Sequence, residues 1–208
     1  MYSVKEIFFT IQGEGCNTGS YAVFCRFSGC NLWTGREKDR KDSICNFCDT
    51  DFIGTDGLNG GKYKNPQDLA SKAYSLWRGT HKPFIVLTGG EPLLQVNEPL
   101  IKELHRTGFT IALETNGTIK APNDIDWICV SPKENSELAQ DYGDELKLVY
   151  PQKKILPKDF EKLNFKNFLL QPMDGPQVKD NTIAARKFCD HNNNWKLSLQ
   201  THKVLGYP

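Results

Sequence analysis

Six short hydrophobic runs recur along the chain, separated by longer segments that have the spacing of helices. The runs cover residues 22–27, 84–87, 110–113, 127–130, 146–149 and 167–170. They are too continuous to have one face in water, which is typical of strands in a parallel sheet that is covered by helices. The alternation of such strands with helical segments predicts an α/β fold built from β/α units.

Three helices are predicted between these runs. One begins at the pair Asn65-Pro66, because Asn is a good cap and Pro fits the first helical position. A second is expected to begin at Asn97, and a third covers about residues 181–191. A fourth near residues 158–163 has weaker support, because prolines interrupt that region.

The chain length limits the size of this fold. A length of 208 residues suits one domain, so we expect residues 1–208 to form a single unit. A full TIM barrel has eight strands and typically about 250 residues. Only about six parallel strands can be counted here, which predicts a partial, TIM-like β/α barrel. An incomplete barrel has an edge to cover, and dimerisation is one way to cover it.

Composition narrows the class of ligand. The 26 basic and 25 acidic residues give a net charge of +1, so no overall field attracts nucleic acid or an anionic membrane. Charged residues interrupt the first 20 positions, and no stretch approaches the roughly 20 apolar residues of a membrane span. We therefore expect a cytoplasmic protein with a small-molecule ligand and no direct contact with nucleic acid or membrane.

Three of the seven cysteines, Cys30, Cys45 and Cys48, form a candidate cluster site. An odd number of cysteines in a cytosolic chain favours metal or redox chemistry over disulfides. Three thiolates can hold an iron–sulfur cluster and leave one iron free, whereas structural zinc and electron-transfer clusters usually take four protein ligands. The segment at about 31–44, which separates the first two cysteines, is charged and is expected to be a solvated insertion.

Polar segments directly follow four of the predicted strands. The carboxyl ends of parallel strands meet at one edge of a sheet or barrel, where active sites lie, so these segments should converge. Cys30 follows another strand by three residues and should join them there. The four segments are residues 88–92, 114–117, 131–133 and 171–174.

The cysteines resemble those of the radical S-adenosylmethionine (SAM) superfamily, in which three cysteines hold a [4Fe–4S] cluster and SAM binds the fourth iron. The usual pattern is Cys-x3-Cys-x2-Cys, with an aromatic residue before the last cysteine. Residues 45–48 fit its second half, but 14 residues separate the first two cysteines. That longer spacing resembles one branch, the 7-carboxy-7-deazaguanine synthases.

Further segments similar to that branch span the whole chain. A lone Gly-Gly pair would be a weak signal, because glycines most often mark turns, but the split cysteine motif and TGGEP together are specific. The segments are TIQGEG (10–15), FSGCNLW (27–33), CDTD (48–51), TGGEP (88–92), ETNG (114–117), SPK (131–133), QPMD (171–174) and QTHK (200–203).

The resemblance implies a radical SAM lyase of queuosine or deazapurine biosynthesis. Its substrate would be 6-carboxy-5,6,7,8-tetrahydropterin, converted to 7-carboxy-7-deazaguanine by hydrogen abstraction from C6, ring contraction and loss of ammonia. A 5′-deoxyadenosyl radical would do the chemistry, so no side chain is expected as a catalytic acid or base. The implied cofactors are the [4Fe–4S] cluster, SAM and Mg²⁺. The implied partners are an electron donor, such as a flavodoxin or ferredoxin, and a second copy in a homodimer.

The resemblance also assigns ligands to residues. Thr50 would bind Mg²⁺, although the residues alone favour Asp49 or Asp51, because carboxylates are the usual ligands. SAM would contact Phe47, Gly89, Gly90, Glu91, Glu114, Asn116, Ser131, Pro132, Lys133, Gln171, Pro172, Met173 and Asp174. The pterin would contact Ile11, Gln12, Gly13, Glu14, Arg26, Thr88, His202 and Pro208.

Several of these assignments have a chemical reason and a plainer alternative. Arg26 can grip a carboxylate with two parallel hydrogen bonds, but it can also reach solvent from a strand end. Glu91 can accept from the SAM ammonium, or it can be an ordinary solvated loop carboxylate. Two other functions stay open from the residues: a radical SAM activase that acts on a partner protein, and a non-catalytic zinc module.

Overall fold

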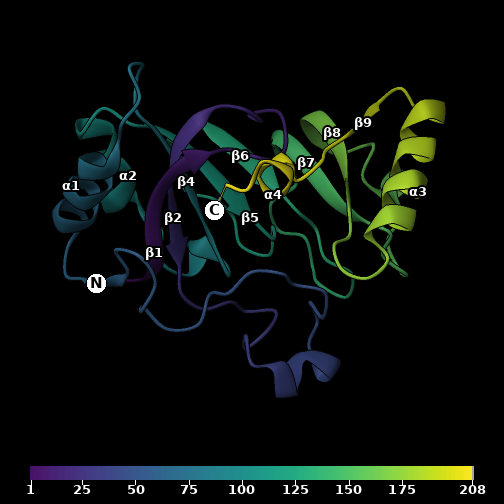
Figure 1. Cartoon of the computed structure of the whole chain (residues 1–208), viewed down its shortest axis with the longest axis horizontal. Helices are drawn as coiled ribbons and strands as arrows, with labels where there is room; N and C mark the ends of the chain where they lie inside the picture. Colours follow the sequence, from purple (N-terminus) through teal and green to yellow (C-terminus); the bar gives the residue numbers. More distant parts are fainter. Residues whose placement is uncertain (208) are drawn as a thin grey trace.

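A nine-stranded, mostly parallel sheet runs through residues 1–207, the part of the chain described by a computed structural model (Figure 1). Within these residues the strand order is β3-β1-β2-β4-β5-β6-β7-β8-β9. The strands are β1 (Tyr2–Ile11), β2 (Tyr21–Phe27), β3 (Gly61–Tyr63), β4 (Phe84–Gly89), β5 (Thr110–Thr115), β6 (Trp127–Val130), β7 (Tyr142–Tyr150), β8 (Asn164–Pro172) and β9 (Trp195–Leu197).

All six hydrophobic runs are strands, which confirms the predicted α/β class and the partial barrel. Strand β2 pairs in parallel with β4, and strands β4 to β9 pair in parallel with one another in that order. Strand β1 is antiparallel to β2, and β3 is antiparallel to β1. Strands β1, β3 and β9 were not predicted. In β1, Lys5 and Glu6 interrupt the hydrophobic pattern, and the other two strands are only three residues long.

The three well-supported helices are present: α1 (Pro66–Leu76), α2 (Glu98–Arg106) and α3 (Val178–His191). The Asn65 and Asn97 side chains accept backbone hydrogen bonds at the starts of α1 and α2. The fourth predicted helix is reduced to the short 3₁₀ turn η3 (Pro157–Asp159), with Pro at its first position. Two other 3₁₀ turns, η1 (Glu37–Asp42) and η2 (Pro92–Leu94), and the short helix α4 (Thr201–Leu205) complete the elements.

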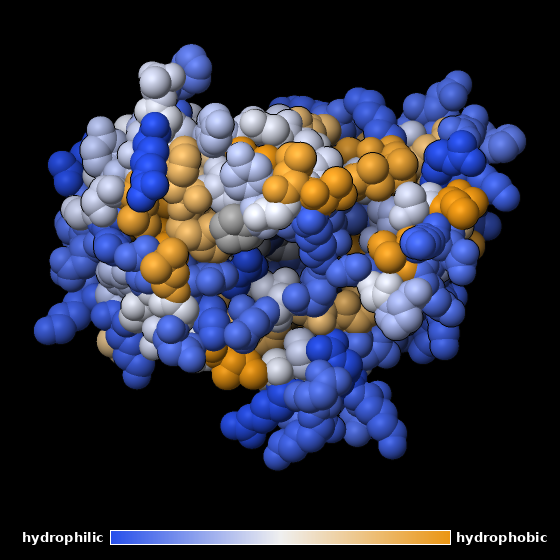
Figure 2. Space-filling view, viewed as in Figure 1, coloured by the Kyte–Doolittle hydropathy of each residue, from blue (hydrophilic) through white to orange (hydrophobic). Residues whose placement is uncertain are grey.

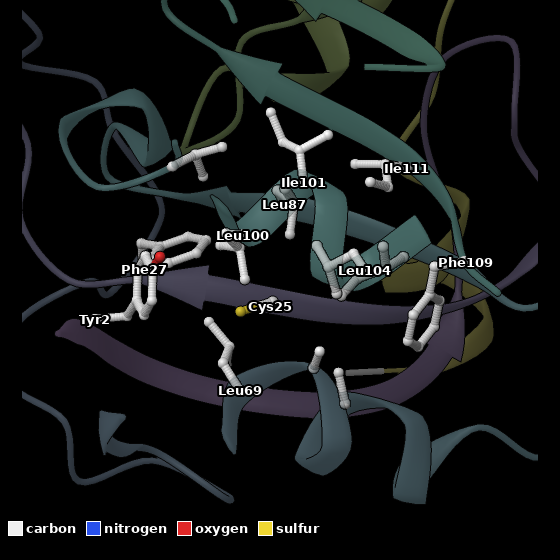
Figure 3. Packing of buried hydrophobic residues seen from close by; sticks show 14 of the residues in the cluster. Tyr2, Cys25, Phe27, Leu69, Leu87, Leu100, Ile101, Leu104, Phe109 and Ile111 are labelled. Carbon is white, nitrogen blue, oxygen red and sulfur yellow. The ribbon is translucent and has the colours of Figure 1, made fainter. Parts of the chain in front are cut away.

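Helices α1, α2 and α3 cover one face of the sheet, which we call the outer face. Leu69 of α1 and Leu100 and Leu104 of α2 pack with Cys25 and Leu87 from the strands in one buried cluster (Figure 3). A second buried cluster joins α3 to β6, β7, β8 and β9. Burial of these apolar side chains fixes the outward-facing positions of each strand, because side chains alternate between the two faces.

The opposite, inner face has a different composition. Ala22, Val86 and Ala112 form a small buried apolar cluster on it. Toward the carboxyl ends of these and other strands, this face carries polar side chains. They include Arg26 in β2, Thr88 in β4, Glu114 in β5, Lys147 in β7 and Gln171 in β8. Alternation along the strands therefore directs apolar residues into the core and polar residues toward one shared space.

The predicted insertion at about 31–44 extends away from the sheet. It contains η1, and hydrophilic residues cover this projecting part of the molecule (Figures 1 and 2). Leu32 and Trp33 at its start are buried, and Trp33 stacks edge-on against Phe52. Among the described residues, no helix has both the length and the apolar content needed to cross a bilayer.

Candidate active site

A cavity of about 520 Å³ lies at the carboxyl ends of the central strands and opens on the face shown in Figure 2. The strand-end segments and the cysteines meet there, as the topology of a parallel sheet requires. The sequence-predicted residues that line it are Ile11, Gln12, Gly13, Glu14, Arg26, Cys30, Cys45, Phe47, Cys48, Thr50, Thr88, Gly89, Gly90, Glu114, Asn116, Ser131, Lys133, Gln171, Pro172, Asp174 and His202.

Three of the expected SAM contacts are not on the cavity wall. The Pro132 carbonyl accepts a hydrogen bond from Gln152, and the Met173 backbone bonds with Tyr150 and Asn181. Glu91 is the third. The expected pterin contact Pro208 lies outside the described residues. The cavity wall therefore contains most, but not all, of the residues that were predicted to bind the two ligands.

Glu91 is fully buried, so its interpretation as a solvated loop carboxylate is wrong. It accepts hydrogen bonds from Leu93 N at 3.0 Å, Thr115 Oγ1 at 2.8 Å and Asn116 N at 2.8 Å. Burial raises the pKa of Glu91, and these donors lower it in part. The carboxylate joins the loop after β4 to the end of β5. Contact with SAM stays a prediction, and this arrangement does not support it directly.

The two glycines of the TGGEP loop are needed for packing within the protein. Gly89 has φ +136°, and a Cβ there would lie 2.2 Å from the Phe27 carbonyl oxygen. A Cβ on Gly90 would lie 2.1 Å from the Gly29 carbonyl oxygen and 2.8 Å from Cβ of Cys30. The loop therefore lies directly on the backbone that leads to the first cysteine, and only residues without a side chain allow it.

Cys30, Cys45 and Cys48 line one end of the cavity. Cys30 comes from the loop after β2, and the other two follow η1. The Cys45 thiol donates to Cys48, and this hydrogen bond is the main reason that the pKa of Cys48 is lowered to about 6, while that of Cys45 is raised. Burial raises the pKa of Cys30. In residues 1–207 no three Cys, His, Asp or Glu side chains form a close-set group for a single metal ion.

Thiolates are the ligands that iron–sulfur clusters take from proteins, so the donor set at this end of the cavity fits such a cluster. Arg40 braces the loop that carries two of the donors. Its Nη1 donates to the Asn46 and Cys48 carbonyl oxygens at 3.1 and 3.0 Å, and its guanidinium lies 4.1 Å from the centre of the Trp33 ring. The charged insertion therefore holds the last two cysteines in place.

The expected magnesium ligand, Thr50, lines the same end of the cavity. The two carboxylates that the residues alone favoured also line it, but each forms an ion pair. Asp49 lies 2.8 Å from Nζ of Lys203, and Asp51 lies 2.9 Å from Nζ of Lys5. Both carboxylates are therefore engaged by lysines, and Thr50 stays the predicted ligand.

The expected pterin contacts come from three separate parts of the chain. Arg26 projects from the inner face of β2, and its Nε donates to Glu6 Oε1 at 2.8 Å. Gly13 follows β1, and its carbonyl oxygen accepts from both N and Oγ1 of Thr201 at the start of α4. A Cβ on Gly13 would lie 2.0 Å from Nδ1 of His202. Helix α4 therefore packs directly on the loop after β1 and brings His202 to the cavity.

Lys147 is the main cavity residue that was not predicted. It lies in β7 within the run Leu-Lys-Leu-Val, and its side chain is only 5% exposed. Its Nζ lies 2.5 Å from Oε2 of Glu14 and 3.6 Å from Oε1 of Glu114. A lysine inside a hydrophobic run is a usable signal, because lysine is almost never fully buried without a partner. Gln200 and Lys203 also line the cavity and were not predicted.

The ion pair between Lys147 and Glu14 should make stability fall in acid. Burial raises the pKa of Glu14, but Lys147, with Gln200 and Gln171, outweighs it and lowers the pKa from 4.5 to about 2. Because the folded state holds this carboxylate ionised, its stabilisation is complete above pH 4.5 and is lost as the pH falls toward 2. The measurement is the free energy of unfolding in urea across this range, for wild type and Glu14→Gln.

The variant has no acid at position 14. The free energy of unfolding of wild type should therefore exceed that of Glu14→Gln by a constant amount above about pH 5, and this difference should shrink at lower pH. If this difference does not change with pH, Lys147 does not lower the pKa of Glu14, and the prediction is wrong.

Comparison with known proteins gives full-length relatives. No protein-family model matches the chain. The 7-carboxy-7-deazaguanine synthase of Bradyrhizobium diazoefficiens is 57% identical over 206 residues, covering 99% of this chain and 98% of that protein. The synthase of Caulobacter vibrioides is 56% identical over 208 residues, covering 100% and 99%.

A solved structure agrees with these relatives. The crystal structure of QueE from Escherichia coli superposes with a TM-score of 0.69 at 25% identity and covers 96% of this chain and 93% of that one. Sequence and fold are thus similar over nearly the whole length to proteins of one kind. The chain belongs to the 7-carboxy-7-deazaguanine synthase family.

Proposed function

We propose that this chain converts 6-carboxy-5,6,7,8-tetrahydropterin into 7-carboxy-7-deazaguanine and ammonia, a step of queuosine or related deazapurine biosynthesis. The observation that carries the proposal is one cavity whose wall holds three thiols at one end together with Arg26, Gln12 and a partly buried Glu14. Such a cavity offers cluster ligands beside groups that suit an anionic, guanine-like molecule. Family membership supports the same reaction.

The proposed cofactors are a [4Fe–4S] cluster, SAM and Mg²⁺. Cys30, Cys45 and Cys48 would hold the cluster, and Thr50 would bind the Mg²⁺. When bound, the cluster and SAM together supply a carbon-centred radical that removes the hydrogen from C6 of the pterin. The role of the protein is then to bind, orient and shield its ligands, so it needs no side chain as a catalytic acid or base.

The remaining residues would position the two organic ligands. The Arg26 guanidinium would hold the pterin carboxylate, while Gln12 and Glu14 would bind the amide and amine edge of the ring. The backbone of Gly89 and Gly90 would meet the amino acid part of SAM, and Glu114 would bind its ribose hydroxyls. The other SAM contacts proposed are Phe47, Glu91, Asn116, Ser131, Pro132, Lys133, Gln171, Pro172, Met173 and Asp174, and the other pterin contacts are Ile11, Gly13, Thr88, His202 and Pro208.

The wider setting follows from the same assignment. We propose one domain over residues 1–208 that works as a homodimer in the cytoplasm and takes electrons from a flavodoxin or ferredoxin. The near-neutral charge of +1 supports a small-molecule substrate rather than a nucleic acid or a membrane surface. The two alternative functions, an activase of a partner protein and a zinc module, do not account for the polar groups around Glu14.

The test is an anaerobic assay of the reconstituted protein with reductant, SAM, Mg²⁺ and 6-carboxytetrahydropterin. Mass spectrometry should find 7-carboxy-7-deazaguanine together with 5′-deoxyadenosine. 5′-Deoxyadenosine without the deazaguanine would favour the activase, and neither product from a protein loaded with iron and sulfide would overturn the proposal.

A further inference from the structure

Lys147 is a buried cation that lies between two carboxylates. Burial lowers its pKa, but Glu114, Glu14 and Glu145 outweigh burial and raise it well above the ordinary value. The ammonium is therefore charged at neutral pH. Its two nearest carboxylates are Glu14 Oε2 at 2.5 Å and Glu114 Oε1 at 3.6 Å.

The two carboxylates belong to different parts of the site. Glu14 follows β1, where the pterin is proposed to bind, and Glu114 is in β5, where the SAM ribose is proposed to bind. Gln12 forms a second link, because its Nε2 donates to the same Oε1 of Glu114 at 2.8 Å. The Glu114 side chain is 22% exposed, so a ligand in the cavity can reach it. One short network therefore joins the two proposed binding regions.

Such a network has a thermodynamic consequence. A ligand that fixes Glu114 also restricts Lys147 and, through it, Glu14. The second ligand then meets groups that are already ordered, and it loses less conformational entropy when it binds. Coupling of this kind is reciprocal: each ligand must raise the affinity for the other by the same factor.

We propose that Lys147 is a positioning residue that couples the binding of SAM to the binding of the pterin, by holding Glu14 and Glu114 in fixed places. The inference rests on the proposed function, because it uses that function's two ligands. It adds a task to the site: SAM and the pterin each raise the affinity of the protein for the other.

The test is equilibrium binding without turnover. The cluster-loaded protein, with Mg²⁺ and without reductant, is titrated by calorimetry with the oxidised analogue 6-carboxypterin, in the absence of SAM and at saturating SAM. The quantity of interest is the ratio of the two dissociation constants. For wild type we expect SAM to tighten pterin binding about fivefold or more, which is the usual lower range of coupling between sites.

Lys147→Met removes the charge and keeps much of the side-chain volume, so the ratio should fall to about one. Glu14→Gln should lower the ratio in the same way. It also weakens pterin binding directly, but that loss affects both titrations and cancels in the ratio. The matched control is Lys166→Met on β8, which removes an ion pair with Asp144 at 2.7 Å from a side chain that is 75% exposed. It should keep the wild-type ratio.

A wild-type ratio of one would overturn the coupling, and so would a folded Lys147→Met protein that keeps the wild-type ratio. If Lys147→Met does not fold, Glu14→Gln decides in the same way. Wild-type protein that binds no 6-carboxypterin at any SAM concentration would instead overturn the proposed function. The two failures are therefore distinguishable in one set of titrations.

Discussion

Cys48→Ala should abolish 7-carboxy-7-deazaguanine formation, by more than about a thousandfold, and should strip the protein of most of its iron. Cys48 follows η1 in a loop outside the buried clusters of the sheet, so its removal leaves the core intact. Two thiolates cannot replace three as cluster ligands. The measurements are iron and sulfide per chain after anaerobic reconstitution, thermal unfolding by circular dichroism, and product by mass spectrometry.

A matched control for this variant is Cys189→Ala. Cys189 is a free cysteine on α3 that does not line the cavity, so its loss should leave iron content and product unchanged. Wild-type iron content in Cys48→Ala would contradict the assignment of this cysteine. An unfolded Cys48→Ala protein that had bound zinc would instead point to a structural metal module, because such modules depend on their metal to fold.

Arg26→Ala should lower kcat/KM for the pterin by roughly a hundredfold to a thousandfold, because it removes one partner of a partly buried, charge-assisted contact. The Arg26 side chain is 19% exposed and is anchored through Nε to Glu6, which directs the guanidinium from the inner face of β2 into the cavity. Cleavage of SAM to 5′-deoxyadenosine in the absence of pterin should persist. Product and 5′-deoxyadenosine are measured together under single-turnover conditions.

Two further variants sharpen the interpretation. Arg26→Lys keeps a charge but not the planar fork, so it should recover only part of the loss. Arg106→Ala on α2 removes an arginine that is 68% exposed and ion-paired with Glu103, away from the cavity, and it should behave as wild type. If Arg26→Ala loses SAM cleavage and pterin turnover equally, the arginine supports the fold of the site rather than the substrate.

Most of the fold could be predicted because its strands are buried on both faces. Hydrophobic runs such as residues 84–87 and 110–113 need no tertiary information to be read as strands. Strand β1 is different. It pairs at an irregular register between Val4 and Glu6, so its pattern does not alternate cleanly. The short helix α4 was missed because it is held by contacts with Gly13, which no local pattern records.

The residues of the candidate site also fall into those that the sequence predicted and those that it did not. The cysteines and strand-end loops could be found in the sequence, because their spacing and their position after strands are local properties. Lys147 and the buried state of Glu91 could not be found so easily, because each depends on partners from other strands. Gly90 was expected to contact SAM. The structure adds a contact with Gly29 that would exclude any side chain.

The hydrogen bonds that join the side chains of the cavity wall connect residues far apart in the sequence. This long-range connection has a consequence for folding. Gln12 meets Glu114 across 102 positions, Glu14 meets Lys147 across 133, and Gln200 meets Glu14 across 186. No partly folded intermediate that lacks one of these segments can present the complete pocket. Small ligands should therefore recognise only the native state and raise the melting temperature by mass action. Resistance to heat or to proteases in the presence of a ligand then measures the fraction of molecules that have folded correctly.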